Sequence, residues 1–132
     1  MCARFYLLIL LSVSINCFSQ LKQDAVIQKV SVREFDSLMD SLQDEIVVDL
    51  RTPDELKNGR IPGALAIDFF GPEFETSIHA LDKQKVYLLY CAGGGRSAET
   101  AELMAKFGFK RIYNLAQGFN GWAKQKMPIS RE

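Results

Sequence analysis

The sequence predicts an α/β fold with a five-stranded, mainly parallel sheet and helices on both faces. Two short apolar runs rich in β-branched or aromatic residues, "EIVVDL" (45–50) and "KVYLLY" (85–90), are typical of strands buried on both faces. Stretches with helical spacing alternate with such runs along the chain, and strands joined by helices pair in parallel. Because ligands bind at the carboxyl ends of such strands, the residues that follow each strand are candidate site residues.

In the first half of the domain, a strand is expected over 25–30, where the sequence reads "AVIQKV". The "SVRE" that follows is a capping box, so a helix is expected to start at Ser31. After the strand at 45–50, "TPDE" is a second capping box with a proline in the first turn, which predicts a helix over 52–59. "IPGALAI" (61–67) is expected to be a turn that leads into a short strand.

In the second half, helices are expected to alternate with strands in the same way. The expected elements are a helix over 72–81, a strand over 85–90, a helix from Ser97 to Phe107, a strand over 111–115, and a short last helix or turn ended by Pro128. Gly108 is a helix stop signal. No repeat, low-complexity run or linker interrupts this order, so residues 20–132 are expected to form one domain.

Residues 1–19 have the pattern of a secretory signal peptide. Arg4 precedes an apolar run from 5 to about 13, which is too short to span a bilayer, and small and polar residues follow it. We expect cleavage after Ser19 and an exported domain, periplasmic or secreted. A lipoprotein signal with the lipid on Cys17 is one alternative, and a buried N-terminal element is another.

Charge and cysteine content narrow the function classes. The 16 Lys and Arg residues balance 16 Asp and Glu residues, which argues against nucleic acid as the main partner. Of the three cysteines, Cys2 and Cys17 lie in the expected signal, so Cys91 is left without a partner for an intrachain disulfide. An unpaired thiol in an oxidising compartment indicates a chemical role.

The stretch "CAGGGRS" follows the strand at 85–90 and leads into a helix. Glycines allow successive peptide N–H groups to turn toward one point, and the helix start adds its positive dipole end. Both features favour the thiolate of Cys91, and Arg96 adds a permanent positive charge. The single histidine, His79, is expected at the surface, away from this loop. The expected substrate-binding residues are Ala92, Gly93, Gly94, Gly95, Arg96 and Ser97.

This loop resembles the active-site loop of rhodanese-type sulfurtransferases, with the pattern Cys-x-x-Gly-x-Arg. "DLRTPDELKNGRIPGALAI" (49–67) is similar to a second signature of that family, and "NLAQGFNGW" (114–122) to a third. The expected signal and the size of the single domain look most like the small exported, phage-shock-type rhodaneses. The chain departs from the family pattern at Arg60, Gln117 and Ala92, where histidine, glycine and a basic or polar residue are usual.

The resemblance implies a mechanism and a set of partners. Cys91 would take sulfur from a small anion such as thiosulfate, hold it as a persulfide, and pass it to cyanide, a thiol or another protein's thiol. Neither a metal nor an organic cofactor is expected. Asp49 and Arg51 would support the shape of the loop, although Asp49 could instead cap the following helix.

Two other classes stay open. Phosphatases and arsenate reductases also use a cysteine in an anion-binding loop before a helix. Four residues lie between Cys91 and Arg96, one fewer than in the usual phosphatase loop, and the shorter loop suits a persulfide better than a phosphate. A non-catalytic binding module is the third class, and the retention of Cys91 argues against it.

Overall fold

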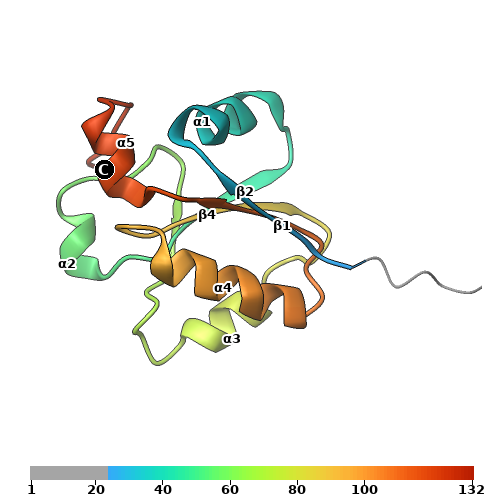
Figure 1. The fold of residues 1–132 in the computed structure, drawn as a ribbon. Coiled ribbons are helices and arrows are strands. Elements are labelled where there is room, and N and C mark those ends of the chain that lie inside the picture. Colours follow the sequence, from blue (N-terminus) through green and yellow to red (C-terminus); the bar gives the residue numbers. More distant parts are fainter. Residues whose placement is uncertain (1–23) are drawn as a thin grey trace, which may run out of the picture.

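The computed structural model describes residues 24–132, so the expected signal at 1–19 lies outside the described residues (Figure 1). Strands and helices alternate as expected, in the order β1 (Val26–Val30), α1 (Val32–Ser41), β2 (Glu45–Asp49), α2 (Pro53–Leu56), β3 (Leu65–Ala66), α3 (Phe74–His79), β4 (Val86–Tyr90), α4 (Gly95–Lys106), β5 (Arg111–Leu115) and α5 (Gly118–Lys124). Among residues 24–132, no helix has the length and apolar character that a membrane span requires.

The predicted parallel α/β sheet is confirmed. Its strand order is β1-β5-β4-β2-β3, and all four strand pairings are parallel. Every residue of the central strand β4 is buried, as the apolar run predicted. The register pairs Asp49 of β2 with Tyr90 of β4, and Leu50 N–H donates to Tyr90 C=O at 2.9 Å. The chain therefore leaves β2 and β4 side by side, at the same edge of the sheet.

Helices cover both faces of the sheet (Figure 1). On one face, α1 and α5 bury Phe35 and Trp122, whose rings meet edge to face with centroids 6.2 Å apart. On the other face, α3 and α4 bury Ile78 and Met104 against the sheet. These two cores fix the sheet edge where β2 and β4 end.

Both predicted capping boxes are present. Ser31 Oγ accepts from Glu34 N–H at 3.3 Å, and the Glu34 carboxylate accepts from Ser31 N–H at 2.8 Å. The same exchange links Thr52 and Glu55, at 3.3 and 2.8 Å. Since each box satisfies two otherwise unpaired N–H groups, it fixes where its helix begins.

Three helices differ in extent from the sequence prediction. Helix α4 begins at Gly95, two residues before Ser97, because Gly94 takes φ +100° and ends the preceding loop there. Helix α2 is a single turn, Pro53–Leu56, rather than 52–59. Helix α3 spans Phe74–His79 rather than 72–81, and the residue before it provides no side-chain cap. His79 is exposed, as predicted.

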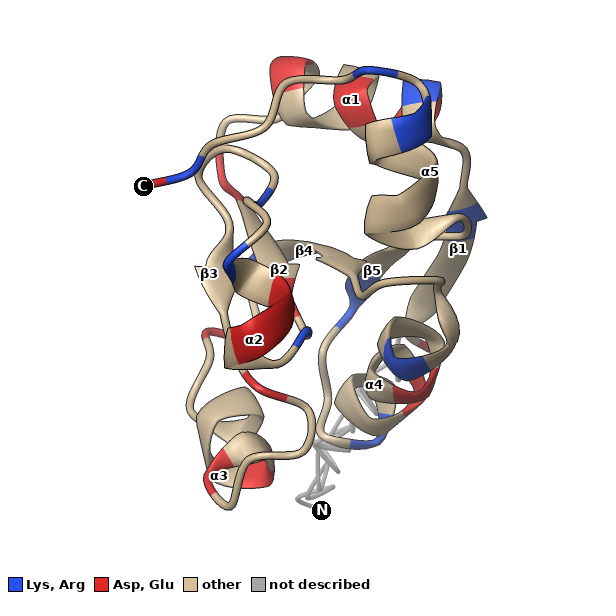
Figure 2. Cartoon of the chain, turned by 90° about the vertical axis from the view of Figure 1, so that its left-hand side faces the viewer, with Lys and Arg blue, Asp and Glu red and all other residues tan. Residues whose placement is uncertain are grey.

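Charged side chains of both signs are spread over the helices and loops, whereas α2 carries only acidic residues (Figure 2). This distribution accords with the balanced composition. Within residues 24–132, no group of three or more His, Cys, Asp or Glu side chains could hold a metal ion.

Candidate active site

Two loops form the candidate site at the carboxyl edge of the sheet. The Cys91 loop (91–97) follows β4, and the Asp49 loop (49–59) follows β2, its neighbour in the sheet. The Cys91 loop contains the sulfur, and the Asp49 loop contains buried charged side chains. The predicted site residues are thus brought to one edge of the molecule.

The Cys91 sulfur lies at the base of its loop, with the residue only 1% exposed. Gly94 N–H donates to Sγ at 3.1 Å. The Ser97 hydroxyl, in the first turn of α4, lies 3.5 Å from Sγ. A backbone donor and a hydroxyl therefore lie within hydrogen-bond distance of the sulfur.

These donors favour the negatively charged sulfur. Burial raises the pKa of Cys91, but hydrogen bonds from the Ser97 side chain and from the backbone of Ser97, Gly94 and Gly93 outweigh it and lower the pKa below its ordinary value. The direction is the one expected for a cysteine at the start of a helix. The loop itself thus favours the thiolate form of Cys91.

Of the three loop glycines, only Gly94 is required by the backbone. It has φ +100°, and a Cβ there would lie 2.3 Å from the carbonyl oxygen of Ala116. A Cβ at Gly93 or Gly95 would meet nothing within 4 Å, and both residues are exposed. Of the three, Gly94 alone therefore uses the left-handed conformation that glycine permits. Gly93 and Gly95 leave open space over the sulfur loop instead.

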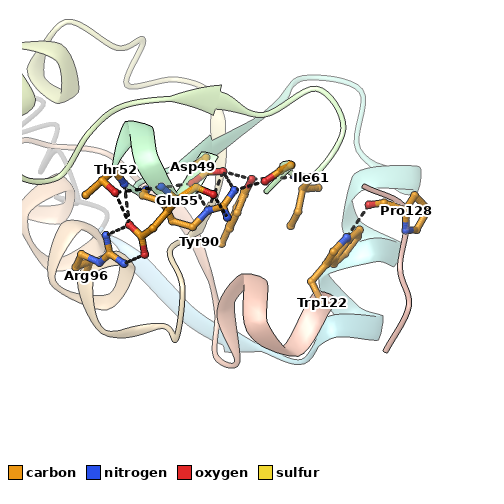
Figure 3. A network of polar contacts seen from close by, with 10 residues as sticks. Asp49, Thr52, Glu55, Ile61, Tyr90, Arg96, Trp122 and Pro128 are labelled. Atoms are coloured by element: carbon orange, nitrogen blue, oxygen red, sulfur yellow. Dashed lines mark hydrogen bonds and ion pairs between the residues drawn. The ribbon is translucent and has the colours of Figure 1, made fainter. Parts of the chain in front are cut away.

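The positive charge that Arg96 adds to the loop is paired with a carboxylate. Its guanidinium makes two hydrogen bonds to the Glu55 carboxylate, at 2.9 and 2.8 Å (Figure 3). The hydrogen bonds from Arg96 lower the pKa of Glu55 to about 2. Glu55 also belongs to the capping box of α2, so one carboxylate joins the Asp49 loop to the Cys91 loop. Charge on Cys91 is among the interactions that raise the pKa of Arg96, after its bond to Glu55.

Asp49 and Arg51 form a buried ion pair, with the two residues 0% and 2% exposed. Arg51 Nη2 lies 2.7 Å from Asp49 Oδ2, and the same nitrogen donates to Gly59 C=O at 2.8 Å. The Tyr90 hydroxyl donates to Asp49 and accepts from Ile61 N–H at 3.0 Å (Figure 3). Burial and the charge of Asp49 raise the pKa of Tyr90, so the hydroxyl keeps its proton. Asp49 thus stabilises the loop through its contacts with Arg51 and Tyr90.

The alternative role of Asp49, as a helix cap, is wrong because Thr52 caps α2. Arg51 also stacks on Phe119 of α5, with its guanidinium carbon 3.9 Å from the ring centroid. Burial lowers the pKa of Arg51, but hydrogen bonds and charge from Asp49 raise it above its ordinary value. The side-chain hydrogen bonds of both residues are made within the Asp49 loop and with Tyr90 of β4.

The start of α5 closes the other side of the Cys91 loop. Phe119 N–H donates to Cys91 C=O at 2.8 Å, and Asn120 N–H donates to Ala92 C=O at 3.0 Å. Gly118 permits this approach, since a Cβ there would lie 2.4 Å from the Ala92 oxygen. The third signature of the sequence therefore positions the backbone that carries Cys91.

Sequence reasoning missed two contributors to the site. Asn114 of β5 is 1% exposed, and its amide contacts both Ser97 and Gly94. Tyr90, interpreted only as a strand residue, is a hydrogen-bond partner of Asp49. A polar side chain near the end of an otherwise apolar buried strand was the available signal for Asn114.

A cysteine with a lowered pKa, in a backbone loop between a parallel strand and a helix, defines a cysteine-dependent α/β domain. The Rhodanese-like domain family matches residues 31–125, and the chain belongs to this family. A sulfurtransferase from Allochromatium vinosum is 32% identical over 87 residues, 66% of this chain and 79% of that protein. A thiosulfate sulfurtransferase from Glaesserella parasuis is 26% identical with the same coverage.

The fold agrees with solved structures of the family. A rhodanese-related protein from Thermoplasma volcanium superimposes with a TM-score of 0.70 at 25% identity, over 80% of this chain and 99% of that one. Together, the family match and the sulfurtransferase relatives support sulfur transfer as the general activity.

Proposed function

We propose that this protein is a sulfurtransferase that carries sulfur on Cys91. In the first step, the Cys91 thiolate attacks the outer sulfur of a small anionic donor such as thiosulfate. A sulfur–sulfur bond forms at Sγ, the donor's own sulfur–sulfur bond breaks, and sulfite leaves with the electron pair. The negative charge then resides on the outer sulfur of the Cys91 persulfide.

In the second step, cyanide, a small thiolate or another protein's thiolate attacks this outer sulfur. The Cys91–sulfur bond breaks, the electron pair returns to Sγ, and thiocyanate or a new persulfide leaves. Peptide N–H groups of residues 92–97 are proposed to hold the outer sulfur while it carries charge. The two half-reactions share one enzyme intermediate, so the kinetics should be ping-pong.

The observation that carries this proposal is the surroundings of Cys91 Sγ. A buried sulfur receives a hydrogen bond from Gly94 N–H at 3.1 Å and has a lowered pKa, while Gly93 and Gly95 leave the space beside the loop open. These features supply a nucleophile and room for one further sulfur. Ala92 offers no charge to a dianion, so we propose that donor affinity rests on the backbone and Arg96.

Steady-state kinetics with thiosulfate and cyanide test the proposal. Parallel lines in double-reciprocal plots and thiocyanate formation are expected for the protein, and none for Cys91→Ser. The phosphatase alternative gives the opposite result, namely turnover of p-nitrophenyl phosphate without thiocyanate. The binding-module alternative gives neither activity.

The role of Arg96 in donor binding has its own test. Arg96→Ala removes a positive charge and leaves the Glu55 carboxylate unneutralised beside the loop. We expect KM for thiosulfate to rise on the order of tenfold, equivalent to about 1.4 kcal/mol. Lys57→Ala is the matched control, because Lys57 pairs with Asp54 on the exposed side of the same region. Equal thiosulfate kinetics in Arg96→Ala and the parent would remove Arg96 from the donor site.

We also propose that residues 1–19 direct export, with the mature chain starting at Gln20. The amino-terminal sequence of the protein recovered from its native host tests this. A lipid-modified Cys17 at the amino terminus would support the lipoprotein alternative, and an intact Met1 would contradict export by cleavage.

A further inference from the structure

Asn114 is a buried amide with two contacts to the Cys91 loop and none to the sulfur. It lies in β5, one residue before the strand ends, and is 1% exposed. Asn114 Nδ2 donates to Gly94 C=O at 3.3 Å, and its Oδ1 lies 2.6 Å from Ser97 Oγ. Any effect of Asn114 on the sulfur must therefore pass through Ser97 or through the loop backbone.

The Ser97 hydroxyl has three possible hydrogen-bond acceptors nearby and one proton to donate. Asn114 Oδ1 lies at 2.6 Å, Gly94 O at 3.2 Å and Cys91 Sγ at 3.5 Å. A hydroxyl has a single proton, so it donates fully to one acceptor at a time. The shortest of these distances, to Asn114 Oδ1, favours the arrangement in which the hydroxyl proton points away from an uncharged sulfur.

A charge on sulfur changes this competition. A thiol S–H can itself donate to Ser97 Oγ, which leaves the hydroxyl proton with Asn114. A thiolate has lost its own proton and is a charged acceptor, and hydrogen bonds to charged groups are the stronger ones. The hydroxyl then gains more by turning toward Sγ, although Asn114 Oδ1 loses its donor.

We infer that Asn114 is a positioning residue for the Ser97 hydroxyl. Asn114 Oδ1 accepts the hydroxyl proton while Sγ is uncharged, and the hydroxyl turns to donate to Sγ when the sulfur is a thiolate. The acceptor of the Ser97 hydroxyl therefore depends on whether Sγ carries a negative charge. This role is distinct from donor binding, and it assigns a task to a buried amide that contacts the loop.

The inference deepens the proposed function and, for the persulfide stage, rests on it. When sulfur is transferred, the negative charge moves from Sγ to the outer sulfur, and Sγ becomes uncharged. The hydroxyl then returns to Asn114 Oδ1. Asn114 therefore stabilises the persulfide relative to the free thiolate, and its removal should leave less persulfide at equilibrium with a given mixture of thiosulfate and sulfite.

The other charged groups near the sulfur should be the same in the parent and in the Asn114 variants. Arg96 has an electrostatic interaction with Cys91, and its guanidinium is paired with Glu55. The Asp49 charge is paired with Arg51. Among residues 24–132, the hydrogen bonds of the Asn114 side chain go to Ser97 and Gly94 and not to these charged groups. Substitution of Asn114 should therefore leave the two ion pairs in place.

A double-mutant cycle with Ser97→Ala tests the inference. The thiolate absorbance of Cys91 is titrated against pH in the parent, Asn114→Ala, Ser97→Ala and the double variant. Each background has its own Cys91→Ser blank, which removes the signals of Cys2, Cys17 and the tyrosines. At a pH below the midpoint of the titration, we expect Asn114→Ala to raise the thiolate fraction about two- to tenfold, the range of one hydrogen bond.

In the Ser97→Ala background, Asn114→Ala should change the thiolate fraction little. An equal change in both backgrounds would overturn the inference, because the effect would then pass through the Gly94 carbonyl. A decrease in the Ser97 background, or no change there, would also overturn it. Unfolding by denaturant reports the separate, merely structural effect of losing the bond to Gly94, which is expected in both backgrounds.

Asn114→Asp keeps the cycle interpretable if Asn114→Ala does not fold. A carboxylate holds the hydroxyl proton more firmly, so the thiolate fraction should fall, and fall further when Ser97 is present than in Ser97→Ala. The direct repulsion from the carboxylate acts in both backgrounds and cancels. An equal fall in both would contradict the inference. Because the titration uses the free protein, it stands or fails independently of whether sulfur transfer occurs.

Discussion

The two loops at the sheet edge are stabilised by different kinds of interaction. Charged side chains hold the Asp49 loop, where a buried carboxylate and guanidinium satisfy each other and nearby carbonyls. Backbone N–H groups and small neutral side chains hold the Cys91 loop. The difference shows that a buried ion pair fixes the Asp49 loop, whereas the hydrogen bonds to the sulfur come from a peptide N–H and a hydroxyl.

One contact joins the two loops through charge. The Glu55 carboxylate caps α2 in the Asp49 loop and binds Arg96 in the Cys91 loop. Its side chain is 33% exposed, and that of Arg96 is 19% exposed. This pair lies in partly solvated surroundings, unlike the pair of Asp49 and Arg51, so the two arginines should differ greatly in their contribution to stability.

Arg51→Ala should have the largest effect on stability. It leaves Asp49 as a buried charge without its partner, and breaking such a pair costs about 3–5 kcal/mol. Arg96→Ala is the matched control and should cost about 1 kcal/mol or less, because its pair is partly solvated. Denaturant unfolding at neutral pH measures both. Similar losses of unfolding free energy in the two variants would contradict the view that the buried and the partly solvated ion pairs differ in their contribution to stability.

Gly94→Ala should rank second. A residue with a Cβ at φ +100° is strained, and this Cβ would lie 2.3 Å from the Ala116 oxygen, so we expect a loss of about 2–4 kcal/mol. Gly93→Ala is the control, since its Cβ would meet nothing within 4 Å and its φ is not in the left-handed region. Unfolding of the two variants is compared directly, and an equal loss would contradict a requirement specific to Gly94.

Tyr90→Phe should cost about 1–3 kcal/mol, because it leaves Asp49 and the Ile61 N–H without a buried partner. Tyr87 is the control on the same strand. Its hydroxyl donates to Asp82 C=O, at 2.7 Å in a partly buried position, so Tyr87→Phe should cost about 1 kcal/mol or less. A larger loss for Tyr87→Phe would show that Tyr90 does not support the Asp49 loop as described.

The smallest expected effect is the loss of the bridge between the loops in acid. Arg96 lowers the pKa of Glu55 from 4.5 to about 2. A lowered pKa means that the bridge stabilises the fold above pH 4.5 and that this contribution is lost as pH falls toward about 2. The stability difference between the parent and Glu55→Gln should be about 1 kcal/mol or less at neutral pH and vanish near the lower limit. If the stability difference between the parent and Glu55→Gln grew as the pH fell, the bridge would not be the cause of the lowered Glu55 pKa.

The fold could be predicted from the sequence because its signals are local. The buried run that became β4 and the capping boxes at Ser31 and Thr52 each depend on residues adjacent in the chain. The position of Cys91 at the end of β4 followed from the same run. A carboxyl-edge site then follows from the parallel topology alone.

The contacts that complete the site could not be predicted, because they join distant segments. Glu55 meets Arg96 across 41 positions, and Tyr90 meets Asp49 across the same separation. Their pairing depends on which strands are neighbours in the sheet and in which register. The early start of α4 also escaped prediction, because Gly94 ends the loop through its backbone conformation rather than through a capping side chain.

The location of the transferred sulfur tests the central claim most directly. The protein is incubated with thiosulfate, freed of it, digested without reductant and examined by peptide mass, with Cys91→Ser treated in parallel. The account predicts one added sulfur on the peptide that contains Cys91, lost again on addition of cyanide, and no added sulfur in Cys91→Ser. Sulfur found only on Cys2 or Cys17, or retained in Cys91→Ser, would contradict it.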